Sequence, residues 1–305
     1  MCVASMKDVV PILLMGCLFI LTYGLALAVI PTFEAAGVSV YENPNDPLNV
    51  LYFLLTLLLV TAALLLIAKF WKKRFVQVIV LGSIAYVMFF LFYVLSYSVL
   101  SDTYGLVLSV ASVVVIMVLL VKYPEWYVTD AAGILLGLAS IAMLGISLGI
   151  HLVILLLTGL AIYDAISVYK TRHMVDLADV VLDLRLPVML VIPKKRGYSQ
   201  IKDKKSLKEK LQKGEERDAF FMGLGDIVMP GILVASVFHN IGNGGIIMAF
   251  SVILGTLIGF AVLLVFLVQG KPQAGLPFLC GGAILGYLLS SYVLFGQLVG
   301  LLLGL

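Results

Sequence analysis

Charge is almost absent from long stretches of this 305-residue chain, and that absence constrains its fold more than any other feature. Charged residues make up 12% of the chain, against about 25% in an average soluble protein. Apolar runs long enough to cross about 30 Å of hydrocarbon, at 1.5 Å per residue, recur along the chain. They cover 9–30, 49–69, 75–100, 104–121, 128–147, 149–169, 219–238, 245–269 and 276–303. We therefore predict an all-α polytopic membrane protein with nine transmembrane helices.

The basic residues predict the orientation of this bundle. Threading nine spans places all 20 Lys and Arg on one side of the membrane, at Lys7, 69–74, Lys122, 170–218 and Lys271. By the positive-inside tendency, the N-terminus is cytoplasmic and the C-terminus is outside. The net charge of +3 comes from these loops, so it gives no case for binding nucleic acid. The expected partner surface is the lipid bilayer.

One sizeable polar segment divides the chain. We predict a six-helix N-terminal half over 1–169, a cytoplasmic loop over 170–218 and a three-helix C-terminal half over 219–305. Within the loop, 178–193 is rich in Val, Leu and Ile, which predicts short strands or a hairpin at the membrane surface. The Lys-rich stretch 194–217 is predicted to be a mobile loop or a solvated amphipathic helix.

Glycines four residues apart recur in the predicted helices, and in lipid they let helix backbones approach closely. The pairs are Gly133/Gly137, Gly145/Gly149, Gly255/Gly259, Gly282/Gly286 and Gly296/Gly300. We assign them to packing within the bundle and predict no oligomeric state from them.

Two aspartates, Asp164 and Asp226, interrupt apolar runs, where each costs roughly 2.5 to 3.5 kcal/mol at mid-helix on insertion scales. Counted from Lys170 and Asp218, they lie about 9 and 12 Å from the cytoplasmic ends of their helices. On neighbouring helices the two carboxyls would share one proton, because a low dielectric opposes two adjacent negative charges. Such a pair suits amide hydrolysis, in which one group activates water and the other protonates the leaving nitrogen.

Composition alone leaves other interpretations of these carboxyls open. Each could bond to a hydroxyl and only fix helix packing, both could form a proton or cation pathway, or the chain could be a helix-binding scaffold without turnover. We predict no metal site and no cofactor. His151, His173 and His239 are expected at interfaces or in solvent, and no zinc or serine-hydrolase motif occurs.

The residues around the two aspartates carry a family resemblance. Tyr163-Asp164 and Gly223-Leu224-Gly225-Asp226 resemble the YD and GxGD motifs of the presenilin and signal peptide peptidase family of intramembrane aspartyl proteases. The likeness continues through 227–231, and 185–193 resembles the stretch that follows the sixth helix of signal peptide peptidases. The third family motif, Pro-Ala-Leu, is matched by Ala274-Gly275-Leu276-Pro277, which lacks the first proline and has glycine for alanine.

This resemblance implies a microbial presenilin-like protein with catalytic Asp164 and Asp226 facing each other toward the cytoplasmic side. It implies that substrates are transmembrane helices. Tyr163, 223–225 and 274–277 would bind substrate or shape the site, and 185–193 would suit strand addition to an unwound substrate. In this family a cytoplasmic N-terminus is linked to substrates whose own N-terminus is outside.

Overall fold

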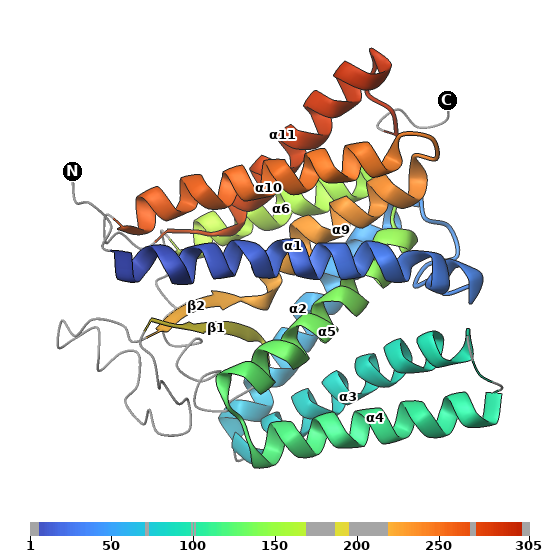
Figure 1. Ribbon diagram of the computed structural model, residues 1–305, viewed down its shortest axis with the longest axis vertical. Helices are drawn as coiled ribbons and strands as arrows, with labels where there is room; N and C mark the ends of the chain where they lie inside the picture. The colour runs from blue at the N-terminus through green and yellow to red at the C-terminus, as the bar shows by residue number, and fades with distance from the viewer. Residues whose placement is uncertain are drawn as a thin grey trace.

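The structure is a computed structural model that describes residues 6–70, 73–98, 100, 102–168, 187–194, 219–268 and 273–300. Within these residues the chain forms nine helices and a small two-stranded sheet, which lies between α1 and α5 in Figure 1. The helices are α1 (Met6–Ala35), α2 (Leu48–Phe70), α3 (Lys73–Tyr97), α4 (Asp102–Lys122), α5 (Trp126–Ser147), α6 (Ile150–Ile166), α9 (Leu224–Asn240), α10 (Gly245–Val268) and α11 (Leu276–Phe295). The strands are β1 (Met189–Pro193) and β2 (Ala219–Gly223).

Six of the described helices, α1, α3, α4, α5, α10 and α11, are long and apolar enough to cross a membrane. The chain is therefore an integral, multi-pass membrane protein. Helices α6 and α9 have 17 residues each, or about 26 Å at 1.5 Å per residue, slightly less than the hydrocarbon thickness. Within α2, the apolar segment Leu48–Ala63 is shorter than the six spans named above. Nine complete crossings remain a prediction.

The predicted seventh span begins five residues too early. Residues Ala219–Gly223 form β2, which pairs with β1, and α9 starts only at Leu224. A short apolar run fits a strand or a helix equally well, and here pairing with β1 satisfies its backbone groups. The strand predicted within 178–193 is thus present as β1, but its partner lies beyond the loop. Residues 178–186 and 195–217 lie outside the described residues.

The sheet has a fixed alternation of inward and outward backbone groups. The Leu224 N–H donates to the Val188 carbonyl oxygen at 2.9 Å, and hydrogen-bonded and non-bonded pairs alternate along an antiparallel ladder. The hydrogen-bonded pairs are therefore Leu190 with Met222 and Ile192 with Phe220. In the alternate pair, Val191 and Phe221 direct their N–H and C=O groups away from the opposite strand.

Glycines bring the helices of the core into backbone contact. Helix α9 contacts α5, α10, α11, α6 and α1. A Cβ on Gly145 of α5 would lie 2.2 Å from the Cβ of Ala235 in α9, and one on Gly255 of α10 would lie 2.2 Å from the Gly282 oxygen in α11. At these places a larger residue would push the helices apart. The predicted role in helix packing is confirmed for Gly145, Gly255 and Gly282, whereas Gly149 is the N-cap of α6 and a Cβ there would meet Asn45.

The C-terminal end of the last helix differs from the prediction. Helix α11 ends at Phe295, eight residues before the predicted limit, because Gly296 has a left-handed φ of 67° and Gly300 a φ of 81°. These two glycines form turns and are not a helix-packing pair. The segment after α11 is held by Tyr287, whose hydroxyl donates to the Val299 carbonyl oxygen at 2.5 Å.

Candidate active site

Asp164 and Asp226 lie at the helix ends that face the sheet. Asp164 lies two residues before the end of α6, and Asp226 is the third residue of α9. Helices α6, α9 and α11 contact one another, and β2 leads directly into α9 (Figure 1). The two acidic residues therefore lie at similar depth on contacting helices.

The start of α11 meets the carboxyl of Asp164. The Leu276 N–H donates to Asp164 Oδ2 at 3.1 Å, and the Gly275 N–H also bonds to this carboxyl. The first N–H groups of a helix have no partner within the helix, so Asp164 satisfies donors of α11 from another helix. The positive end of the α11 dipole also stabilises negative charge there. This contact fixes the Gly275-Leu276 turn against α6.

The carboxyl of Asp226 lies between two glycines. A Cβ built on Gly223 would lie 3.3 Å from Asp226 Oδ2, and one built on Gly275 would lie 3.4 Å from the same oxygen. Gly223 is the N-cap of α9, and its N–H bonds to the carboxyl of Asp226 three residues later, as in half of a capping box. The structure thus brings Gly223 of the GxGD motif and Gly275 of the third motif to the carboxyl of Asp226.

The two carboxyls form one electrostatic unit. Asp164 is 3% exposed, Asp226 is half-buried, and the two groups interact electrostatically. Little water is available to screen them, so two negative charges at this place repel each other strongly. Sharing one proton between the two carboxyls would relieve this repulsion. Such a pair can take a proton from water and give another to a substrate.

Two residues beside the pair were not predicted. Tyr23 of α1 donates its hydroxyl to the Ile227 carbonyl oxygen at 3.0 Å, and Cys280 lies one turn inside α11. Both side chains are fully buried and interact electrostatically with Asp226. Nothing in the sequence indicates that α1 reaches this site. For Cys280 the available signal was its spacing of four residues from Leu276, which puts both on one helix face.

A third buried carboxyl lies near the sheet. Asp130 of α5 is 6% exposed and accepts a hydrogen bond from the Val191 N–H of β1 at 2.8 Å. The sequence held the same signal as for the other two aspartates, since Asp130 falls within the predicted span 128–147. Asp130 is not among the predicted site residues.

Other predicted site residues lie apart from the carboxyls. Tyr163 is 64% exposed on the surface of α6, and its hydroxyl makes no hydrogen bond in the described part of the chain. Gly225 faces open space. Leu224 and Ala274 are buried, and Leu224 packs against α5. Pro277 lies in the first turn of α11, where its missing N–H costs no helical bond.

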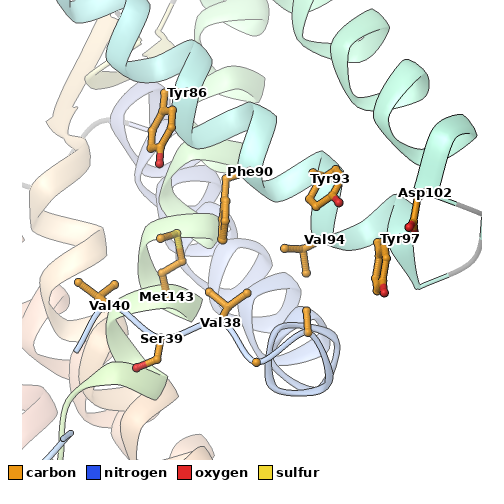
Figure 2. A pocket seen from close by; sticks show the side chains of 12 residues that line it. Val38, Ser39, Val40, Tyr86, Phe90, Tyr93, Val94, Tyr97, Asp102 and Met143 are labelled. Carbon is orange, nitrogen blue, oxygen red and sulfur yellow. The ribbon is translucent and has the colours of Figure 1, made fainter. Parts of the chain in front are cut away.

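A pocket of about 730 Å³ lies at the opposite end of the bundle, between the α1–α2 connection, α3 and α5. Figure 2 shows Val38, Phe90 and Met143 around it, and none of the predicted site residues lines it. Within the described residues, no group of three or more His, Cys, Asp or Glu is arranged to hold a metal ion. The candidate site is therefore built from the two carboxyls and the backbone around them.

Comparison with known proteins identifies the family of the chain. Residues 16–297 match the family described as signal-peptide peptidase, presenilin aspartyl protease. Signal peptide peptidases of Mus musculus and Homo sapiens are 35% and 33% identical to the chain over 136 residues, or 44% of this chain. That stretch spans 31% of each relative, so under a third of its length is matched.

Solved structures match over nearly the whole chain. Two structures of a presenilin family intramembrane aspartate protease, in P2 and C222 space groups, align with TM-scores of 0.69 and 0.67. Their sequence identities are 31% and 30%. The alignments cover 93% and 94% of this chain and 98% and 99% of the chains in the two structures.

Proposed function

Because the chain belongs to the signal-peptide peptidase and presenilin aspartyl protease family, we propose that it hydrolyses peptide bonds within transmembrane helices. Asp164 and Asp226 are the acid/base pair of this reaction. The observation that carries the proposal is the meeting of both carboxyls at the start of α11, with one of them bonded to the last residue of β2. The same place therefore offers acid/base groups and a strand edge.

The reaction proceeds in two balanced steps. The ionised carboxyl takes a proton from water as the water oxygen bonds to the carbonyl carbon, and the protonated carboxyl gives its proton to the carbonyl oxygen. The product of this step is a gem-diol. Its C–N bond then breaks as the first carboxyl protonates the nitrogen, and one gem-diol hydroxyl returns a proton to the second carboxyl. Both acidic groups finish as they began, with a new carboxylic acid and a new amine released.

The edge of β2 that no other described strand pairs with is the proposed docking place for the substrate backbone. A helical peptide bond is shielded by its own hydrogen bonds, so the substrate must unwind, and an edge strand offers replacement partners. The backbone groups of Phe221 point away from β1, and the outward N–H of Gly223 bonds to Asp226. A strand added beside Phe221 therefore passes directly over the carboxyl of Asp226.

The opposite edge of the sheet is a poorer docking place. The tract 185–193 was expected to accept the substrate strand, but the outward N–H of Val191 already bonds to Asp130. Pro193 has no N–H to offer. In addition, α5 contacts β1 along this side (Figure 1). We therefore assign strand addition to β2.

Substrates whose N-terminus is outside are the proposed class. The basic residues predict a cytoplasmic N-terminus, and in this family that topology is linked to substrates whose N-terminus is outside. The same orientation puts the acid/base pair toward the cytoplasm. In intact cells, a Ser39→Cys variant should react with a membrane-impermeant maleimide added outside, while the parent protein should not. Labelling of Ser39→Cys only after the membrane is opened would reverse the assignment.

Cleavage of a transmembrane substrate by purified protein tests the acid/base pair. Asp164→Asn and Asp226→Asn should each lower kcat by at least about 100-fold, the lower limit for losing a general acid or base. Asp102→Asn is the matched control, because this aspartate lines the pocket at the opposite end of the bundle. Full activity in either active-site variant refutes the proposal. Ion flux in proteoliposomes without cleavage would favour a proton or cation pathway instead.

Proline substitution on β2 tests strand addition separately. Phe221→Pro removes an N–H that points away from β1, so it should raise KM for the substrate while the protein stays folded. Phe220→Pro removes an N–H that faces β1, so it should lower thermal stability as well. An unchanged KM in Phe221→Pro contradicts docking at this edge.

A further inference from the structure

Asp130 is a buried carboxyl that the proposed chemistry does not use. It lies in the second turn of α5 and is 6% exposed. An aspartate in an apolar helix is costly to insert, so its presence needs a reason. Among the described residues, its carboxyl bonds to the backbone of β1, where the Val191 N–H donates to Asp130 Oδ1 at 2.8 Å.

The face of α5 around Asp130 fits the strand closely. Gly133 lies three residues later on the same face, and a Cβ there would lie 3.1 Å from Cδ2 of Leu190 and 3.5 Å from the Pro187 oxygen. Gly137, a turn further, faces Leu224 at the start of α9, with 3.4 Å from its Cβ position to Leu224 Cδ1. One stripe of α5 thus follows the chain from β1 to the helix that carries Asp226.

Asp130 accepts its hydrogen bond from a backbone N–H of β1 that cannot bond to β2. Val191 directs its N–H away from β2, and the residue is fully buried. Without the carboxyl, this N–H would be a buried donor with no partner, which is unfavourable. With the carboxyl in place, the middle of β1 is attached to α5 on one edge and to β2 on the other.

The position of β1 is transmitted to the acid/base pair through the sheet. Met189 lies opposite Gly223, which is both the last residue of β2 and the N-cap of α9. Asp226 follows three residues later, and its carboxyl bonds to the N–H of Gly223. A change in the register of β1 therefore displaces Gly223, the end of β2 that bonds to Asp226.

We propose that Asp130 is a positioning residue that holds β1 in register and closes the outer edge of β1, so that a substrate strand adds only to β2. This inference rests on the proposed function, because it concerns how the substrate is presented to Asp226. Asp130 does not touch the reacting atoms. It acts through Val191, β1 and β2.

The test compares variants that keep or remove the hydrogen bond. Asp130→Leu removes the acceptor while keeping the branch at Cγ, and Val191→Pro removes the donor without touching the β1–β2 ladder. Asp130→Asn keeps an acceptor oxygen. Thr129→Val is the matched control on α5, since Thr129 is also buried but its hydroxyl donates to the carbonyl oxygen of Glu125, the N-cap of the same helix.

The readout is the set of bonds cut in one transmembrane substrate, identified by mass spectrometry, together with KM and kcat. Asp130→Leu and Val191→Pro should spread cleavage to bonds two residues away, the period at which a strand repeats its facing, and raise KM at least threefold. Asp130→Asn and Thr129→Val should cut at the wild-type bonds. A merely structural role would lower the yield of active protein without moving the cut.

Wild-type cleavage positions and KM in folded Asp130→Leu or folded Val191→Pro would overturn the proposal. Hydrogen exchange of the β1 amides separates this result from failure of the proposed function. Faster exchange in Asp130→Leu than in Thr129→Val supports the anchoring role even if no substrate is cut. Unchanged exchange of β1 refutes that role even if the wild-type protein is an active protease.

Discussion

Replacing Gly259 of α10 with alanine should impair the site although Gly259 lies on a helix that carries neither aspartate. A Cβ at Gly259 would lie 2.2 Å from the carbonyl oxygen of Phe278 in α11 and 3.4 Å from the Cα of Leu279. The obstacle is backbone, so no side chain can rotate away. The two helices must separate.

The size of this separation follows from the contact distance. Ordinary van der Waals contact begins near 3.4 Å, so the backbone at Phe278 must move by about 1.2 Å. Leu276, two residues earlier, donates its N–H to Asp164 at 3.1 Å, and a shift of this size takes that pair to about 4 Å, beyond hydrogen-bond range. A displacement of about 1 Å in an active site costs about 100-fold in rate. Overpacking should also lower stability by about 1 to 3 kcal/mol.

The assay measures kcat on a transmembrane substrate and the midpoint of thermal unfolding for two variants. Gly281→Ala is the matched control, because Gly281 lies on α11 and a Cβ there meets nothing within 4 Å. Gly259→Ala should lower kcat by about 100-fold, and Gly281→Ala should leave kcat unchanged. Equal activity in both variants would refute the claim that α11 is held against Asp164 by its packing on α10.

Two further predictions use contacts of glycines, and a third removes a buried hydrogen bond. Gly231→Ala should lower the free energy of unfolding by about 1 to 3 kcal/mol, since its Cβ would lie 2.6 Å from Ile141 Cδ1, and adding Ile141→Val, which removes that atom, should recover part of the loss in thermal unfolding. Gly275→Ala should keep near wild-type kcat, because its methyl would lie at an ordinary 3.4 Å from Asp226, whereas Gly275→Leu should abolish cleavage in the same assay. Tyr23→Phe should lower the free energy of unfolding by about 1 kcal/mol through loss of one buried hydrogen bond, measured by thermal unfolding.

The helices could be predicted from the sequence because lipid imposes a simple rule on composition. The break between α5 and α6 was predicted at 147–149, and the structure ends α5 at Ser147 and begins α6 at Ile150. Asp164 and Asp226 could be singled out because a carboxyl in an apolar run is unexpected. Their family motifs then indicated a protease, and the comparisons confirm the family.

Contacts between distant segments could not be predicted in the same way. Residues 219–223 are apolar whether they form a strand or a helix, so only the partner strand β1 decides. Tyr23 reaches α9 across more than 200 positions of sequence, which no local pattern encodes. Gly296 and Gly300 have the spacing of a packing pair, but their left-handed backbone puts them in turns.

A double-mutant comparison tests the central claim most directly, since two groups that share one proton act as a unit. Residual kcat on one transmembrane substrate is measured for Asp164→Asn, Asp226→Asn and the double variant, in protein shown to be folded. Residues that act as a unit are strongly non-additive, so we predict that the double variant is no less active than either single one. Losses that multiply in the double variant, or a single variant with wild-type kcat, would contradict a catalytic pair formed by Asp164 and Asp226.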